Sequence, residues 1–227
     1  KSYFAEEKLA DALREFTAVV KDYPKSAQAA EALYLSALCK YKSGARDEAL
    51  TLLEQAGTTY PASSVYPFVR LRQAQLQSEK NELAAAMPPL IDITNNFQGH
   101  ETFAPALELM ADVRRRQGKT AEALAAFEAL RGEKTLKGRA RRELLRRYGD
   151  LLYQENLFSR AAEVYAELGR DNPAENEAAT NALLLARALF RDGKFDAALE
   201  ALSRLDKNYE DESIRAESLF LKAEISY

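Results

Sequence analysis

The chain has 227 residues, of which 47% are hydrophobic, and it carries a formal net charge of −3 at pH 7. Its 9 glycines and 7 prolines are too few for a collagen-like or disordered chain, and no apolar run approaches the roughly 18 residues of a membrane span. The small negative charge argues against a general nucleic-acid binder. A single cysteine, Cys39, excludes an intrachain disulfide and leaves the redox compartment open.

Apolar periodicity predicts amphipathic helices along the whole chain, arranged in pairs that short turns connect. The first helix of each pair is expected near residues 26–43, 64–79, 102–117, 138–154, 176–191 and 214–227. The second helix is expected near 8–22, 46–59, 82–97, 120–131, 157–170 and 194–209. The chain thus begins inside one pair and ends inside another, so we expect a fragment of a longer protein.

Four markers repeat in one register. An alanine opens the second helix at steps of 37, 37, 37, 38 and 37 residues: Ala12, Ala49, Ala86, Ala123, Ala161 and Ala198. A bulky residue follows it by four positions: Phe16, Leu53, Leu90, Phe127, Tyr165 and Leu202. The first helix carries a small residue: Ala37, Ala74, Ala111, Gly149, Ala186 and Ala223. Seven positions later comes a turn residue: Gly44, Asn81, Gly118, Asn156 and Gly193.

Each marker has a physical reason. Small residues let two helices cross closely, and the bulky residue one turn away fills the space beside the crossing. Glycine or asparagine supplies the left-handed conformation that ends the first helix. Prolines at positions 24, 61 and 173 end second helices, and Ser26 is expected to cap the next helix. Regular pairs over the whole chain predict an all-α fold.

This pattern resembles the tetratricopeptide repeat (TPR) family, whose usual period is about 34 residues. The resemblance covers nearly the whole chain and implies a right-handed α-solenoid of about six helix-turn-helix repeats, truncated at both ends. We expect residues 1–227 to form a single array. The loop 131–138, which contains the one extra residue, is expected to be either a plain loop or a joint between subarrays. Two boundaries, Tyr23-Pro24-Lys25-Ser26 and Tyr60-Pro61-Ala62-Ser63, resemble those of bacterial envelope TPR proteins.

Two prolines interrupt the pattern. Pro88 and Pro89 lie inside a predicted second helix, where each removes an amide donor and clashes with the preceding turn. The helix must therefore bend or begin late. A local bend that neighbouring helices absorb and a bend that creates a distinct surface both fit the sequence.

Residues typical of catalytic and metal sites are scarce, so we expect no enzyme activity, cofactor or metal site. The one histidine, His100, lies in a loop and is expected at the surface. Cys39 follows the small-residue position of a first helix closely and is predicted to be a buried packing thiol. No His, Cys and carboxylate set has metal-ligand spacing, and the glycines form no phosphate-binding cluster.

The family resemblance implies that first helices line a concave groove that binds a partner. Three positions of each first helix should then face the groove: the one directly after the small residue, the one a turn further on, and the one roughly a turn before it. Rings at these positions either bind a peptide or pack against the neighbouring helix. The predicted partner-binding residues are Tyr34, Tyr41, Phe68, Arg72, Arg115, Arg116, Arg146, Arg147, Tyr153, Arg187, Phe190 and Arg191.

Basic residues are concentrated between Arg114 and Arg147, where 12 Lys or Arg face four acids; this window carries +8 and the rest of the chain −11. The window is either an ordinary solvated surface or a site for anions. Arginine suits bidentate capture of carboxylate or phosphate. If Arg115, Arg116, Arg146 and Arg147 converge, they would suit an acidic peptide, a C-terminal carboxylate or an anionic glycan.

The sequence therefore predicts a noncatalytic scaffold that binds a protein or peptide, expected to be acidic, in its groove. A regulatory or docking segment of a larger enzyme or transport assembly is the alternative, and direct binding of an anionic glycan or polymer is another. Self-association is expected if the array ends are uncapped. The envelope-like boundaries favour the bacterial periplasm, with the cytoplasm as the alternative.

Overall fold

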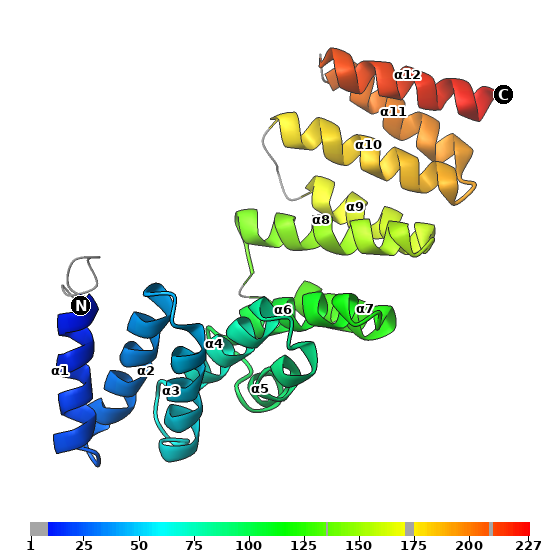
Figure 1. The fold of residues 1–227 in the computed structure, drawn as a ribbon. Coiled ribbons are helices and arrows are strands. Elements are labelled where there is room, and N and C mark those ends of the chain that lie inside the picture. The colour runs from blue at the N-terminus through cyan, green and yellow to red at the C-terminus, as the bar shows by residue number, and fades with distance from the viewer. Residues whose placement is uncertain (1–8, 135, 171–174, 209–210) are drawn as a thin grey trace. The chain divides into compact units, whose positions relative to one another are not determined.

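The computed structural model describes residues 9–134, 136–170, 175–208 and 211–227, without the side chains of 175 and 176. This part of the chain is all α-helical (Figure 1). The helices are α1 (Leu9–Asp22), α2 (Ala27–Lys42), α3 (Arg46–Thr59), α4 (Tyr66–Glu79), α5 (Leu83–Asn96), α6 (Phe103–Arg116), α7 (Thr120–Arg131), α8 (Gly138–Gln154), α9 (Phe158–Arg170), α10 (Glu175–Arg191), α11 (Phe195–Asn208) and α12 (Glu212–Ser226). Their ends lie within about two residues of the predicted ones, which confirms the helical-repeat solenoid.

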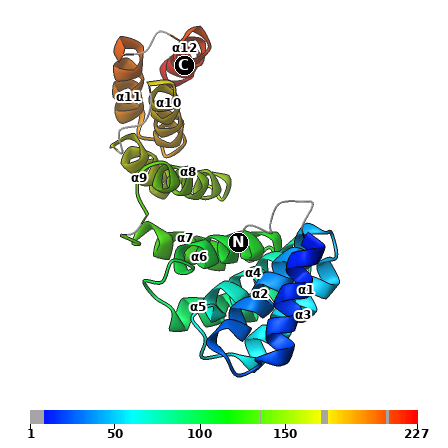
Figure 2. The same cartoon turned by 90° about the vertical axis from the view of Figure 1, so that its left-hand side faces the viewer.

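The chain forms two compact units, and the boundary between them lies within α7. The N-terminal unit covers residues 1–126, and the C-terminal unit covers residues 127–227. In the N-terminal unit α2 packs on α1 and α3, and α4 packs on α5 (Figure 2). In the C-terminal unit α8 packs on α9, and α10 packs on α9 and α11. The joint predicted near 131–138 stays a prediction.

The turns inside the helix pairs have the predicted backbone conformation. Five turn residues adopt positive φ: Gly44 (85°), Asn81 (62°), Gly118 (71°), Asn156 (59°) and Gly193 (76°). Positive φ is costly for most residues but accessible to glycine and, to a lesser degree, asparagine. Each helix pair is therefore closed by the residue type that this turn requires.

The markers of the repeat form the core. Ala37, Ala74, Ala111 and Ala186 in the first helices are at most 1% exposed, as are the alanines that open the second helices. The bulky partners Leu53, Leu90, Phe127, Tyr165 and Leu202 are buried beside them. The end of the array differs, since Ala223 is exposed.

The crossing of α8 and α9 has a glycine where the other crossings have alanine. At Gly149 in α8, a Cβ atom would lie 2.5 Å from Cε1 of Tyr165, a residue of α9. The Tyr165 hydroxyl donates a hydrogen bond to Asp150 Oδ1 at 2.7 Å. Burial, together with this carboxylate, raises the pKa of Tyr165 far above its ordinary value. Glycine is required here because the tyrosine ring occupies the space that a side chain would need.

Several local predictions have clear outcomes. Cys39 is buried, as predicted, and burial raises the pKa of its thiol. His100 is only partly exposed and packs edge-on against Phe68, with 5.3 Å between ring centroids. Ser26 is the N-cap of α2, but its side chain makes no capping hydrogen bond; its hydroxyl is buried without a partner in the described chain. The predicted N-cap position is therefore confirmed, but the side-chain hydrogen bond expected there is absent.

The prolines do not delay the start of their helix. Helix α5 begins at Leu83 and continues through Pro88 and Pro89, the second of which is buried. The alternative in which this helix begins late is therefore wrong. Pro173, the third predicted helix stop, lies outside the described residues.

The described residues lack two features that would indicate other classes of protein. Among the twelve helices none is both long enough and apolar enough to cross a bilayer. The same residues contain no cluster of three or more His, Cys, Asp or Glu side chains placed to hold a metal ion.

Candidate functional site

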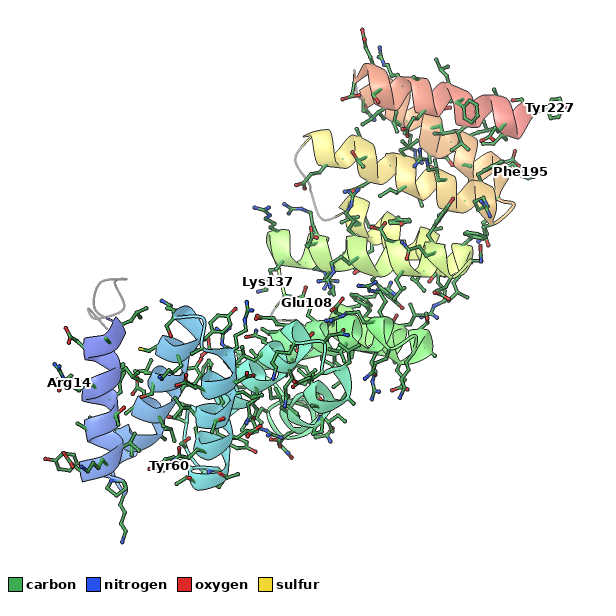
Figure 3. All side chains as sticks on the ribbon, viewed as in Figure 1. Arg14, Tyr60, Glu108, Lys137, Phe195 and Tyr227 are labelled. Atoms are coloured by element: carbon green, nitrogen blue, oxygen red, sulfur yellow. The ribbon has the colours of Figure 1, made fainter. Side chains whose placement is uncertain are left out.

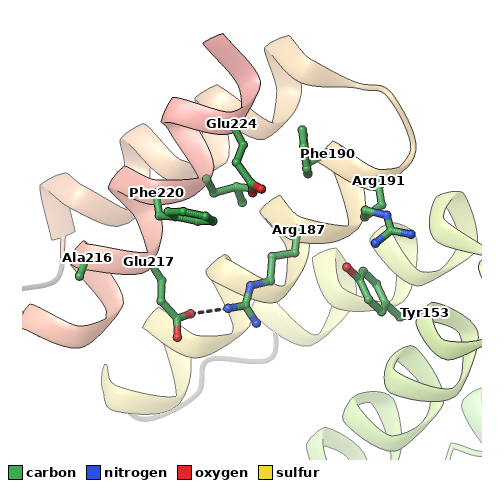
Figure 4. Close-up of a pocket in the computed structure, with 9 residues that line it drawn as sticks. Tyr153, Arg187, Phe190, Arg191, Ala216, Glu217, Phe220 and Glu224 are labelled. Atoms are coloured by element: carbon green, nitrogen blue, oxygen red, sulfur yellow. Dashed lines mark hydrogen bonds and ion pairs between the residues drawn. The ribbon is translucent and has the colours of Figure 1, made fainter. Parts of the chain in front are cut away.

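The C-terminal unit contains a cavity of about 500 Å³ between the first helices α8, α10 and α12 (Figure 4). This volume lies within the range of about 300–1,000 Å³ that is typical of ligand pockets. Tyr153 enters it from α8, and Phe220 extends over it from α12. Four of the predicted partner-binding residues line it together: Tyr153, Arg187, Phe190 and Arg191.

Aromatic rings support the walls of this cavity. Tyr153 packs edge-on against Phe158, with centroids 5.2 Å apart, and Phe190 lies 5.8 Å from Phe195. In both cases the partner is five residues later, across the turn that joins the two helices of a pair. The rings therefore pack against a neighbouring helix and also line the cavity, and peptide binding by them stays a prediction.

Charged groups of both signs surround these rings. Arg187 Nη2 lies 2.5 Å from Glu217 Oε2 in a half-exposed ion pair between α10 and α12. The Arg191 guanidinium lies over the ring of Phe158, 4.9 Å from its centroid. Glu224 adds a further carboxylate to the lining. The cavity thus offers apolar walls for a side chain and charges that could pair with flanking polar groups.

The α12 side of the cavity is open to solvent. Phe220 is 67% exposed, and its neighbour Leu219 is 63% exposed although it does not line the cavity. Phe195 and Tyr227 also project from the surface (Figure 3). An exposed ring at the edge of a cavity can contact a ligand without first breaking core packing.

In the N-terminal unit, predicted groove residues contact one another. Tyr41 donates its hydroxyl hydrogen bond to Glu79, with oxygens 3.0 and 3.2 Å away, and Arg72 lies 5.3 Å from the centroid of its ring. Burial raises the pKa of Tyr34, and the neighbouring Arg72 partly opposes this shift. Arg72 Nε is buried without a hydrogen-bond partner in the described chain, and its guanidinium group makes a cation–π contact with the Tyr41 ring.

Other predicted residues of this unit also have intramolecular contacts. Arg116 donates to Ser78 Oγ at 2.7 Å, to the Ser78 carbonyl at 3.1 Å and to Asn81 Oδ1 at 2.9 Å. It therefore joins the end of α6 to the turn between α4 and α5. Arg115 pairs with Asp112 on its own helix at 2.8 Å. Phe68 packs against His100, as described above.

The remaining two predicted arginines lie on α8. The Arg147 guanidinium lies 5.8 Å from the centroid of the Phe127 ring. Arg146 lines a second, smaller cavity of the C-terminal unit. Because these residues and the pair Arg115 and Arg116 belong to different units, their convergence stays a prediction.

Sequence reasoning missed the α12 side of the cavity, although the repeat register contained the signal. Phe220 precedes the small-residue position Ala223 by three residues, as Tyr34 precedes Ala37. Glu217 precedes it by six residues, as Phe68 precedes Ala74. Applying the same register to the last first helix would have found both residues.

The helices come in pairs that repeat at a nearly constant spacing, and a residue with positive φ lies in the turn of each pair. A cavity lies between successive first helices. These features define an α-helical repeat protein. The comparisons specify which one. Residues 2–148 match the family model described as tetratricopeptide repeat-like domain, and residues 149–213 match the model described as tetratricopeptide repeat. The chain therefore belongs to the tetratricopeptide repeat family.

Solved structures of TPR proteins show the same fold at low sequence identity. The chain is similar to pilF of Pseudomonas aeruginosa, with 17% identity, coverage of 98% of this chain and 93% of that one, and a TM-score of 0.61. It is similar to the C-terminal part of a TPR repeat-containing protein of Cytophaga hutchinsonii, with 14% identity, coverage of 88% and 73%, and a TM-score of 0.66. YrrB, described as a TPR protein with an unusual peptide-binding site, has 13% identity, coverage of 92% and 97%, and a TM-score of 0.63.

No curated protein sequence matches the chain at a significant level. The TPR fold in general supports a scaffold for protein–protein interaction with a protein or peptide partner. The partner and the binding surface have to be argued from this chain's own residues.

Proposed function

We propose that this protein is a noncatalytic scaffold that binds a segment of a partner protein in a groove along its first helices. The binding surface is the cavity between α8, α10 and α12 in the C-terminal unit. The single observation that carries this proposal is the cavity of about 500 Å³ with the exposed Phe220 ring at its edge.

The chemistry of the lining favours an apolar or aromatic side chain as the anchor. Tyr153, Phe190 and Phe220 supply ring surface, and burial of apolar area is the main favourable term in most protein association. Interfaces are often dominated by a few aromatic or arginine residues near their centre. Arg187 and Glu217 would exchange part of their mutual ion pair for polar groups beside the anchor.

The fold neighbours give further support. YrrB is itself described as having a peptide-binding site, and it shares the fold along most of both chains. The peptide-binding site of YrrB is not assigned to this chain. The cavity lined by residues of α8, α10 and α12 supports the binding surface proposed here.

The test is peptide binding by the intact 227-residue chain. Peptides selected from a random 12-residue display library would be synthesised, and their affinity would be measured by fluorescence anisotropy. We expect Phe220→Ala to weaken binding at least tenfold, because this truncation removes the exposed wall of the cavity. Phe220 is 67% exposed, so the variant is expected to fold normally.

Leu219→Ala is the matched control, since it truncates an equally exposed apolar residue of the same helix outside the cavity. We expect its affinity to stay within twofold of the parent chain. Equal losses in both variants, or no loss in Phe220→Ala, would reject the cavity as the binding surface.

Two further parts of the proposal need separate tests. The exposed Leu219, Phe220 and Tyr227 could also pair with a second copy of the chain; sedimentation at several concentrations, with and without Phe220→Ala, measures this self-association. A periplasmic location follows only from the two envelope-like repeat boundaries. Fractionation of cells that express the full-length protein tests it.

A further inference from the structure

The N-terminal unit contains a cavity of about 410 Å³ that lies between the second helices α1 and α3 and the first helix α2. This volume is within the range of about 300–1,000 Å³ that is typical of ligand pockets. None of the residues that line it belongs to the set predicted to bind a partner in the groove. The cavity is therefore separate from the surface proposed above for the partner protein.

The walls of this cavity are mainly aliphatic. Four such side chains line it from the three helices: Leu13, Val20, Leu33 and Leu52. Two hydroxyl groups also line it, but Thr17 donates to the Leu13 carbonyl at 2.7 Å, and Ser36 donates to the Ala32 carbonyl at 2.9 Å. Both hydroxyl hydrogens are thus bonded within their own helices. The walls therefore favour an alkyl chain over a polar ligand.

The next repeat has a different chemistry at the equivalent positions. Arg70 of α4 donates to Asp92 Oδ2 of α5 at 2.9 Å and to Gln73 Oε1 at 3.0 Å. The residues 37 positions earlier, which line the cavity, are in the same order Leu33, Gln55 and Ser36. A leucine cannot form the bonds of the arginine. The aliphatic surface is therefore a property of this repeat and not of the repeat register in general.

The charged residues of the lining are both basic. Lys40 Nζ lies 2.6 Å from Glu48 Oε2, so the charge of Lys40 is partly neutralised. Lys21 is exposed at the end of α1, and it forms no ion pair within the part of the chain that the structure describes. No acidic residue belongs to the lining. A ligand with a negative group at one end of an apolar chain would complement both the walls and Lys21.

We propose that this cavity binds a free carboxylic acid with an unbranched alkyl chain. The chain packs on Leu13, Leu33 and Leu52, and the carboxylate accepts a charge-assisted hydrogen bond from the Lys21 ammonium group. Burial of aliphatic surface supplies most of the affinity, because an exposed ion pair contributes little. This site lies in the N-terminal unit, so it does not require peptide binding beside Phe220.

The first test varies the chain length of the acid. The methyl signals of Leu13, Val20, Leu33 and Leu52 in the intact chain would be followed by ¹H–¹³C NMR during titration with butanoate, hexanoate, octanoate and decanoate. We expect the affinity to rise by about fourfold for each added methylene until the cavity is full, the fold-change that corresponds to about 0.8 kcal/mol per buried CH₂. Absence of saturable shifts at these methyl groups, or equal affinities along the series, would overturn the site.

The second test concerns the charged end of the ligand. We expect octanoate to bind about two- to fivefold more tightly than octanol, which has the same chain without the charge. Lys21→Gln should remove this difference by weakening octanoate alone, and Lys21→Arg should retain it. Equal binding of octanoate and octanol to the parent chain, or equal losses of both in Lys21→Gln, would overturn the assignment of the carboxylate to Lys21.

A third test fills the cavity. Thr17→Trp should weaken octanoate by about tenfold or more, because the large indole ring takes the space that the alkyl chain needs. The matched control is Thr51→Trp. Thr51 is also exposed and also donates its hydroxyl hydrogen bond to the carbonyl four residues earlier, but it does not line the cavity. We expect its octanoate affinity to stay within about twofold of the parent chain, and equal affinities of the two variants would reject this cavity.

The same variants distinguish this inference from the proposed function. Thr17→Trp should leave the affinity for the selected peptides unchanged, and Phe220→Ala should leave the affinity for octanoate unchanged. Loss of octanoate binding in Phe220→Ala would place the acid in the cavity of the C-terminal unit and overturn this inference. Octanoate binding that depends on Thr17, without any peptide that depends on Phe220, would reject the proposed function alone.

Discussion

The groove positions of the two units carry similar residues with different contacts. In the N-terminal unit, Tyr41 is bonded to Glu79, and Arg116 makes three hydrogen bonds to Ser78 and Asn81. In the C-terminal unit, the equivalent rings Tyr153 and Phe190 line a cavity, and each also packs on a ring of the following helix. The same repeat register therefore places polar side chains in hydrogen bonds between repeats of the N-terminal unit and rings on the wall of a cavity in the C-terminal unit.

This difference shows that the position of a residue in the repeat does not decide its role. Tyr34 and Phe220 both precede the small residue by three positions. Tyr34 packs against the core of the N-terminal unit, whereas Phe220 is 67% exposed. A groove residue is therefore accessible to a partner only where the neighbouring helices leave part of its side chain exposed.

The largest expected effect concerns the crossing of α8 and α9. Gly149→Ala should lower the free energy of unfolding of the C-terminal unit by about 2–3 kcal/mol, because the new Cβ would lie 2.5 Å from the Tyr165 ring. The equivalent positions of the N-terminal unit already hold alanine without strain. Urea unfolding followed by circular dichroism measures the loss.

Gly169→Ala is its control, because a Cβ at this α9 position meets no atom within 4 Å. It should stabilise the unit by about 0.5–1 kcal/mol through helix propensity. A neutral Gly149→Ala variant would show that α8 and α9 can separate at no cost, and would contradict the packing described here.

A smaller effect is expected at Arg116. Arg116→Gln should lower the free energy of unfolding of the N-terminal unit by about 1–2 kcal/mol, because it removes hydrogen bonds from a charged donor that is only 31% exposed. Arg115→Gln should change it by less than about 0.5 kcal/mol, since that arginine is exposed and pairs within its own helix. Equal effects of the two substitutions would remove the structural role assigned to Arg116.

The smallest expected effect is on acid stability. Burial alone would raise the pKa of Asp92, but hydrogen bonds from Tyr66, Asn96 and Arg70 outweigh it and lower the pKa. Because the folded pKa lies below the unfolded value of about 3.9, this group contributes stability that is fully present above pH 4. That contribution is lost as pH falls through the folded pKa.

Asp92→Asn should therefore destabilise the protein by about 1 kcal/mol at pH 6 and by progressively less below pH 4. Asp206 of the C-terminal unit, whose pKa is lowered by Lys222 and Ser218 against the effect of burial, should behave in the same way. Urea titrations between pH 3 and 6 measure both differences. A penalty that does not change with pH would show that lost packing, not the carboxylate charge, causes it.

Much of the fold could be predicted from the sequence because each marker has a local cause. Positive φ requires glycine or asparagine at positions such as Gly44 and Asn81, and close crossings require small residues such as Ala74. The absence of a side-chain capping hydrogen bond at Ser26 could not be predicted, because that bond depends on the direction of the hydroxyl group rather than on residue type.

The site was less predictable, since pairing between repeats depends on side-chain geometry. The arginine-rich window indicated anion recognition, but Arg116 is held by Ser78 and Asn81, about 35 residues earlier in the chain.

The most direct test of this account is hydrogen–deuterium exchange of the intact chain with and without a saturating selected peptide. Binding in the C-terminal unit predicts slower exchange in α8, α10 and α12, while α2 and α4 keep their rates. Slower exchange confined to α2 and α4 would contradict the central claim that the open first-helix face of the C-terminal unit binds the partner.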